Sequence, residues 1–253
     1  MTPRVPEELR ASHTPEAIQS RLDDGPSQSY LKDFVYGAVD GCVTTFAVVA
    51  AVEGAQLRAE VVIVLGLANL IADGFSMAVS NYLGTRAEEE RRLRARRIEE
   101  EHIRRIPDGE REEIRQIFAR KGFSGPDLDR AVEIITSDAE RWVDTMLREE
   151  LGMQAEGPSA RRAALATFLA FVAVGFVPLL SFVVKQLFPQ AIDRPFVVSA
   201  ALTALAFFAV GALKGRYLEL RWWLSGVETL AVGGTAAALS YFVGHLLRAL
   251  GGG

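Results

Sequence analysis

Three pairs of metal-binding side chains recur at helical spacing within the highly charged stretch 86–156. Residues three or four positions apart lie on one face of an α-helix, so each pair can direct two donor atoms toward one place. A histidine among carboxylates favours iron, manganese, cobalt or zinc over calcium. The pattern predicts a metal cage built from three pairs: Glu99 with His102, Glu110 with Glu113, and Met146 with Glu150.

Each pair also has a simpler interpretation. The Glu-x-x-His spacing of Glu99 and His102 is the one used in di-iron helical bundles, but in so acidic a stretch it can arise by chance. A surface histidine on a charged helix is the alternative for His102. For Glu88, Glu89 and Glu90 we accept the default, a solvated helix face.

Two aspartates, Asp40 and Asp73, interrupt otherwise apolar segments. A charged side chain in a membrane helix costs about 2.5–3.5 kcal/mol on insertion scales and usually faces an interior path. A carboxylate there can hold a proton and a cation in turn, and Met77 adds a soft thioether one turn from Asp73. The alternatives are a buried polar pair that stabilises helix contacts and a methionine used for packing. A path role for Glu228 is also open.

Five apolar runs must position these groups. Each approaches the roughly 20 residues that a helix needs to cross a bilayer. They cover residues 34–52, 61–83, 163–188, 196–213 and 227–247. Pro178 predicts a kink in the third run, and the lone cysteine, Cys42, is interpreted as a small buried side chain. We therefore expect an all-α membrane protein with five transmembrane helices and a cytosolic helical metal-binding domain inserted between helices 2 and 3.

The charged block predicts a stalk and three short helices. No glycine or proline occurs between Gly84 and Pro107, so the second membrane helix should continue about 33 Å into the aqueous phase. Asp108 is the expected N-cap of the next helix. The predicted parts are an N-terminal cytosolic tail (1–30), helices 1–2 (31–84), the metal-binding domain (85–157) and helices 3–5 (158–253).

The charged residues indicate which partners the protein can bind and how it is oriented in the membrane. The net charge of -4, with arginine and glutamate interleaved, argues against nucleic acid as a partner. Lys214, Arg216 and Arg221 fall in the connection on the same side as the charged block, so the positive-inside tendency places both in the cytosol. The first 29 residues lack the order of a secretory signal.

Several motifs together resemble the vacuolar iron transporter (VIT) family. They are Asp40-Gly41, Ser76-Met77, the turn at Pro107-Asp108, the stretch 146–152 and Pro178-Leu179-Leu180. The resemblance covers nearly all of the chain after residue 30. It implies a homodimer of five-helix subunits that moves ferrous iron, and often manganese, out of the cytosol in exchange for protons.

The resemblance also implies roles for single residues. It places cytosolic ligands at Glu99, His102, Glu110, Glu113, Met146 and Glu150, and the transport path at Asp40 and Met77. Three positions depart from the pattern of plant-like members: His102 stands for a glutamate, Leu147 for a second methionine and Asn69 for an intramembrane glutamate. Asp73, one turn from Asn69, is expected to compensate for that loss.

The predicted function is an antiporter that exchanges Fe²⁺ and Mn²⁺ for H⁺, with Co²⁺ and Zn²⁺ as alternative ions. It would be a transporter rather than an enzyme, with metal ions, the lipid bilayer and a second copy as partners. A bacterial inner membrane is favoured over a vacuolar one. Two rivals are a membrane-anchored iron-oxidising or iron-storing protein and a charged block that only dimerises.

Overall fold

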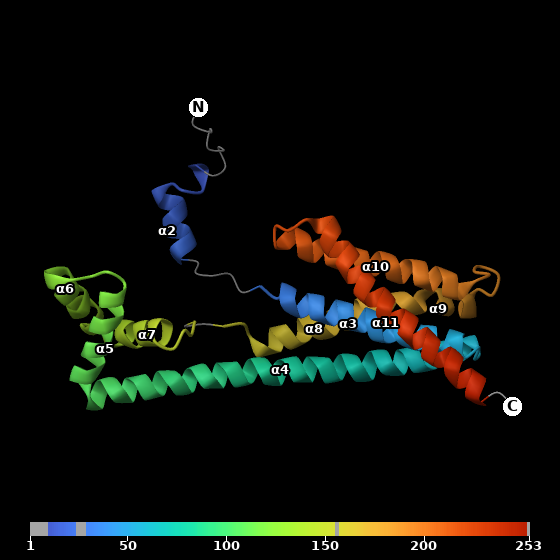
Figure 1. The fold of residues 1–253 in the computed structure, drawn as a ribbon, viewed down its shortest axis with the longest axis horizontal. Helices are drawn as coiled ribbons and strands as arrows, with labels where there is room; N and C mark the ends of the chain where they lie inside the picture. The colour runs from blue at the N-terminus through green and yellow to red at the C-terminus, as the bar shows by residue number, and fades with distance from the viewer. Residues whose placement is uncertain (1–9, 24–28, 155–156, 252–253) are drawn as a thin grey trace.

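The computed structural model describes residues 10–23, 29–154 and 157–251, which contain helices and no β-strand. Helices α3 to α11 form a membrane bundle and, at the far end of one long helix, a group of short helices (Figure 1). The helices are α2 (Pro15–Asp23), α3 (Leu31–Gly54), α4 (Ala59–Arg105), α5 (Pro107–Arg120), α6 (Gly125–Thr136), α7 (Ala139–Glu149), α8 (Ala160–Gly175), the 3₁₀ turn η1 (Val177–Leu179), α9 (Leu180–Leu187), α10 (Pro195–Tyr217) and α11 (Trp222–Gly251).

Five helical segments are long and apolar enough to cross a membrane: α3, α4, α8 with α9, α10 and α11. This confirms the five predicted spans. Helix α3 lies at the centre and packs against α4, α8, α10 and α11. The third span is interrupted by η1 at Pro178, as predicted, because proline has no N–H to donate and its ring clashes with the preceding turn.

Helix α4 is continuous over 47 residues, which corresponds to a length of about 70 Å. Its first half lies in the bundle and its second half carries the charged stretch to the short helices (Figure 1). The prediction of one uninterrupted helix from Val61 to the turn at Pro107 is confirmed. Pro107 is itself the first residue of α5, with Ile106 as the N-cap, so the expectation that Asp108 is the N-cap was wrong. Proline suits that first position because its fixed φ is helical.

Two glycines bring the backbones of α3 and α8 into contact. A Cβ at Gly37 would overlap the carbonyl oxygen of Thr167, and a Cβ at Gly41 would overlap that of Phe171. Close approach of this kind lets helices associate in lipid, where no hydrophobic force drives them together.

Replacing Gly41 with valine should therefore destabilise the bundle. Overpacking a tight contact costs about 1–3 kcal/mol or more, and here the obstacle is backbone that cannot rotate away. Thermal unfolding in detergent and the monodisperse fraction on size exclusion measure the loss. Gly234→Ala on α11 is the control, because nothing lies within 4 Å of an added Cβ there. Equal melting temperatures for Gly41→Val and the wild type would contradict the contact.

The short helices share an apolar core. Met146 and Trp142 of α7 pack with Ile114 of α5 and with residues of α6, while Val143 and Leu147 of α7 pack against Ala95 of α4. The four buried residues of α7 are Trp142, Val143, Met146 and Leu147, and their spacing puts them on one face of the helix. The core fixes α5 beside the end of α4, where the metal-competent residues lie.

Candidate metal centre and polar seam

Three of the predicted ligands come together at the turn between α4 and α5. One donor atom each from Glu99, His102 and Glu110 lies within 4.8 Å of the others. Glu99 and His102 occupy the last turns of α4, and Glu110 occupies the first turn of α5. The chain reverses at Ile106 and Pro107, so side chains that are separated along the sequence face one another.

Burial makes this cluster unusual. Glu99 is 5% exposed and Glu110 is 1% exposed, and the Oε2 atom of each is buried without a hydrogen-bond partner. His102 is half-exposed, and its Nδ1 lies 3.3 Å from Oε1 of Glu110. A buried carboxylate oxygen without a partner is costly. A cation bound between Glu99, His102 and Glu110 would satisfy both oxygens.

Two further predicted ligands act on the cluster electrostatically. Burial, followed by the charges of Glu113 and Glu99, raises the pKa of Glu110 to about 7. Burial and then the charge of Glu150 raise the pKa of Glu99, and burial and then Glu113 raise the pKa of Glu150. His102 opposes each shift. Burial is the main cause of these shifts, and a divalent metal bound beside the carboxylates would favour their charged forms.

Two other predicted residues have different surroundings. Met146 is fully buried in the apolar core of the short helices, so packing explains its burial and its ligand role stays a prediction. Glu228 lies 3.6 Å from Lys214 and is largely exposed. This ion pair joins α11 to α10, and a path role for Glu228 stays a prediction.

A second group of polar residues follows α4 into the bundle. Asn69, Asp73 and Met77 recur every fourth residue and are all half-buried, so they share one face of the helix. Asp40 on α3 is also half-buried and lies close enough to Asp73 for the two carboxylates to interact electrostatically. The amide Nδ2 of Asn69 is buried without a partner. We call this row, together with Asp40, the polar seam.

Sequence reasoning missed two polar residues beside the seam, Asn81 and Asp33. Asn81 continues the four-residue row beyond Met77, and its Nδ2 donates to Asp33 Oδ1 at 2.8 Å and to Thr167 Oγ1 at 2.7 Å. Asp33 is buried in the first turn of α3. The row spacing pointed to Asn81. Asp33 was overlooked because it precedes the apolar run.

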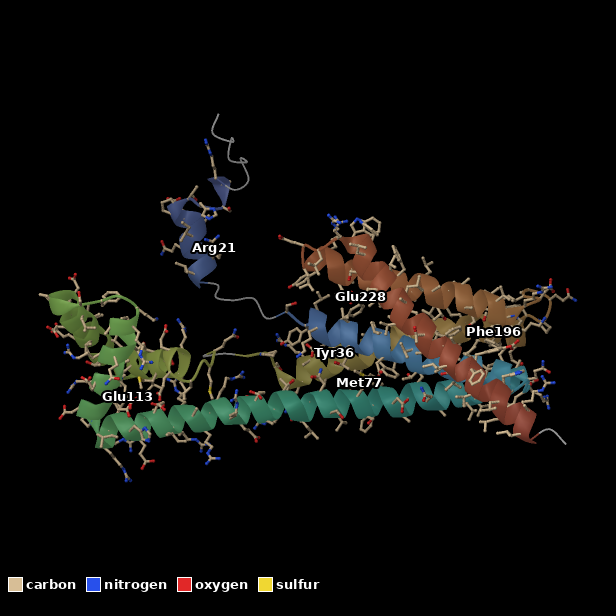
Figure 2. All side chains as sticks on the ribbon, viewed as in Figure 1. Arg21, Tyr36, Met77, Glu113, Phe196 and Glu228 are labelled. Carbon is tan, nitrogen blue, oxygen red and sulfur yellow. The ribbon has the colours of Figure 1, made fainter. Side chains whose placement is uncertain are left out.

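The seam and the metal cluster share one helix but lie far apart. Figure 2 shows Met77 within the bundle and Glu113 beside the far end of α4. From Met77 to Glu99 there are 22 residues of uninterrupted helix, which is about 33 Å. An ion bound at the cluster is therefore well separated from the seam.

Residues 31–245 match the VIT family. The chain belongs to this family. Similar proteins include vacuolar iron transporter 1 of Arabidopsis thaliana, 30% identical over 219 residues that cover 86% of each chain. The vacuolar iron transporter of Toxoplasma gondii is 31% identical over 255 residues, which cover 96% of this chain and 84% of the relative. Vacuolar iron transporter 1 of Oryza sativa is 31% identical over 216 residues.

Family membership confirms the resemblance seen in the sequence. The match spans both the bundle and the charged block. Together with five apolar helices, it makes this VIT family member a multi-pass membrane protein of a transporter family. The roles of Glu99, Glu113, Met146, Glu150 and the other predicted site residues stay predictions.

Metal binding to this VIT family member should strengthen as pH rises. Glu110 has a pKa of about 7, so a metal must displace a proton from it at pH 6 and meets mostly carboxylate at pH 8. That single group changes the apparent affinity by about tenfold between these pH values. Calorimetric titration of the detergent-solubilised protein with Mn²⁺ measures it. A constant affinity between pH 6 and 8 would contradict the role of Glu110.

Proposed function

We propose that this VIT family member carries Fe²⁺, and also Mn²⁺, out of the cytosol in exchange for protons. The observation that carries the proposal is the cluster of two buried, uncompensated carboxylates with a histidine on the same helix as an intramembrane polar seam. Relatives of this chain are named iron transporters. An oxygen-rich set with one imidazole suits ferrous iron and manganese.

The cluster would act as a receptor. Glu99, His102 and Glu110 would hold the ion, with Glu113 and Glu150 adding negative charge nearby. Protonation of the cluster would favour release of the ion. A carboxyl group whose pKa is raised toward neutral takes up a proton readily, and the protonated group binds a cation poorly. Captured ions would raise the local concentration on the cytosolic side of the bundle.

The seam would act as the transport path. Asp40 and Asp73 lie near each other on neighbouring helices, and two close carboxylates can share one divalent cation or hold protons in its absence. Met77 offers a thioether one turn along the row. Protons arriving from the opposite side would displace the metal, which couples the two movements.

A homodimer would complete the seam. The face of α4 beside it exposes small residues at every fourth position, namely Ala68, Ala72, Ser76 and Ser80, a pattern that favours helix association in lipid. A second copy packed there would cover this face. Cross-linking single cysteines on α4 of a Cys42→Ala background tests this arrangement, and the absence of any cross-linked dimer would count against it.

Orientation and location form part of the proposal. The short helices would face the cytosol because the basic connection between α10 and α11 lies at the same end of the bundle (Figure 1). The named relatives are vacuolar, whereas the sequence favoured a bacterial inner membrane. Cysteine-accessibility labelling in cells and fractionation of the expressing organism decide both points.

A proteoliposome assay tests the function. The purified protein should take up Fe²⁺ only when the inside of the vesicles is more acidic than the outside, so that protons leave as the metal enters. The same assay with Mn²⁺, Co²⁺ and Zn²⁺ in turn measures the selectivity. Oxygen consumption measured in the same vesicles addresses the rival, a membrane-anchored iron oxidase. Oxidation of Fe²⁺ without gradient-dependent uptake would overturn the proposal in favour of that rival.

A further inference from the structure

A cavity of about 640 Å³ lies where α4 leaves the bundle and α8 enters it. It faces neither the metal cluster nor the polar seam. Its lining includes Tyr82, Arg86, Arg92 and Arg96 of α4 and, across from them, Ser159 and Arg161 at the start of α8.

The cavity lies at the end of the apolar part of α4, which is the level expected for the membrane surface. Tyr82 is within the last turn of the apolar part of α4, and Arg86 is the first basic residue beyond it. The backbone N–H of Ser159 donates to the hydroxyl of Tyr30 at 3.1 Å. Since Tyr30 precedes α3 and Ser159 precedes α8, both helices enter the bundle at this level.

Positive charge in the cavity is only partly neutralised. Arg86 pairs with Glu89 and Glu90, and Arg96 pairs with Asp144 at 2.8 Å. Arg92 and Arg161 make no ion pair with any residue that the structure describes.

Arg92 nevertheless has a fixed place. Its guanidinium lies against Gly157, where an added Cβ would overlap it. The side chain therefore reaches from α4 to the segment that leads into α8, and it lines the same cavity as Arg161.

The N-terminus of α8 is a second feature of the cavity that favours an anion. Ser159 is its N-cap residue but makes no side-chain cap hydrogen bond, and the first turn holds no acidic residue. Arg161 and Arg162 occupy that turn instead. Cations at a helix N-terminus oppose the helix dipole, whereas an anion would accept bonds from its free N–H groups.

We propose that this cavity binds the phosphate of an acidic phospholipid headgroup. Arginine binds phosphate through paired N–H groups, and basic pockets between membrane helices at the bilayer surface suit such headgroups. The phosphate would lie between Arg92, Arg161 and the first N–H groups of α8. Bound there, it links the stalk half of α4 to the start of α8. This inference does not depend on which ion the protein transports.

Native mass spectrometry of the full-length protein tests the site. The detergent-solubilised wild type is titrated with phosphatidylglycerol, with phosphatidylcholine and with inorganic phosphate. We expect retention of about one phosphatidylglycerol per subunit and no comparable retention of phosphatidylcholine. In the double variant Arg92→Gln/Arg161→Gln, the affinity for phosphatidylglycerol should fall at least about tenfold, because two charge-assisted hydrogen-bonding groups are lost.

The control removes the same charge from the same stalk. Arg94 and Arg97 are exposed on α4 outside the cavity, so Arg94→Gln/Arg97→Gln should bind phosphatidylglycerol as the wild type does. Equal losses in both double variants, or equal retention of the two lipids by the wild type, would overturn the proposal. Binding of inorganic phosphate without phosphatidylglycerol would overturn the lipid assignment. The comparison of lipids on wild-type protein needs no variant, so a poorly folded variant leaves the test intact.

Discussion

Replacing Asp40 with asparagine should lower the initial rate of metal uptake into proteoliposomes by about a hundredfold or more, which corresponds to about 2.7 kcal/mol of lost stabilisation. Asparagine keeps the size of the side chain but can neither carry negative charge nor exchange a proton. Asp40 lies half-buried beside the charge of Asp73 in the middle of the seam. We propose that its carboxylate holds the ion within the membrane, and this variant tests that role.

The control for this variant is Glu53→Gln, which removes an exposed carboxylate at the far end of the same helix α3. It should transport at the wild-type rate. Asp40→Asn should also bind Mn²⁺ at the distal cluster with unchanged affinity, because about 33 Å of helix separates the cluster from the seam. Normal transport by Asp40→Asn would remove the basis for an exchange site in the bundle.

Glu110→Gln should weaken metal binding and stabilise the metal-free protein at the same time. The loss of one buried anionic ligand lowers the affinity for Mn²⁺ by about a hundredfold. In the metal-free protein, the pKa of Glu110 rises from 4.5 to about 7 on folding. Between these values the folded state binds more protons than the unfolded state, so the stability contributed by this group falls as pH rises.

The difference in stability between Glu110→Gln and the wild type should depend on pH. At pH 8 the wild type bears a buried negative charge that costs about 3 kcal/mol, and glutamine removes that cost. At pH 4 the carboxyl group is mostly protonated in both states, so the variant and the wild type should differ little in stability. Thermal unfolding of the metal-free proteins at both pH values measures the difference. Glu112→Gln, an exposed change on the same helix α5, is the control. A destabilised Glu110→Gln at pH 8 would contradict a net cost of burying this charge beside His102.

Features with a local cause could be predicted from the sequence. The five spans follow from runs of apolar residues, and the length of α4 follows from the absence of glycine and proline between Gly84 and Pro107. The clustering of Glu99, His102 and Glu110 needed only helical spacing and one reversal at Pro107. Each of these depends on residues that are close together along the chain, and no contact between distant helices is needed.

Features that depend on how helices align could not be predicted. The hydrogen bond from Asn81 to Asp33 spans 48 residues, and the closeness of Asp40 to Asp73 depends on the same register of α3 against α4. The backbone contacts at Gly37 and Gly41 set the position of α8 rather than that of α4. Local spacing could also not predict the surroundings of Met146. Its i, i+4 spacing with Glu150 predicted a ligand pair, whereas the side chain packs into an apolar core.

The unbroken course of α4 makes the short helices follow the membrane. Helix α4 contains no proline, and no glycine follows Gly84 within it, so its outer part has none of the usual causes of a kink. Val143 and Leu147 of α7 pack against Ala95 in that part of α4. If the half of α4 in the bundle tilts, its charged half and the attached short helices must move with it. A lean of about 10° moves a point 33 Å away by about 6 Å, given the helical rise. The distance between spin labels on the α5 helices of two associated copies would therefore report a change in the tilt of α4 within the membrane.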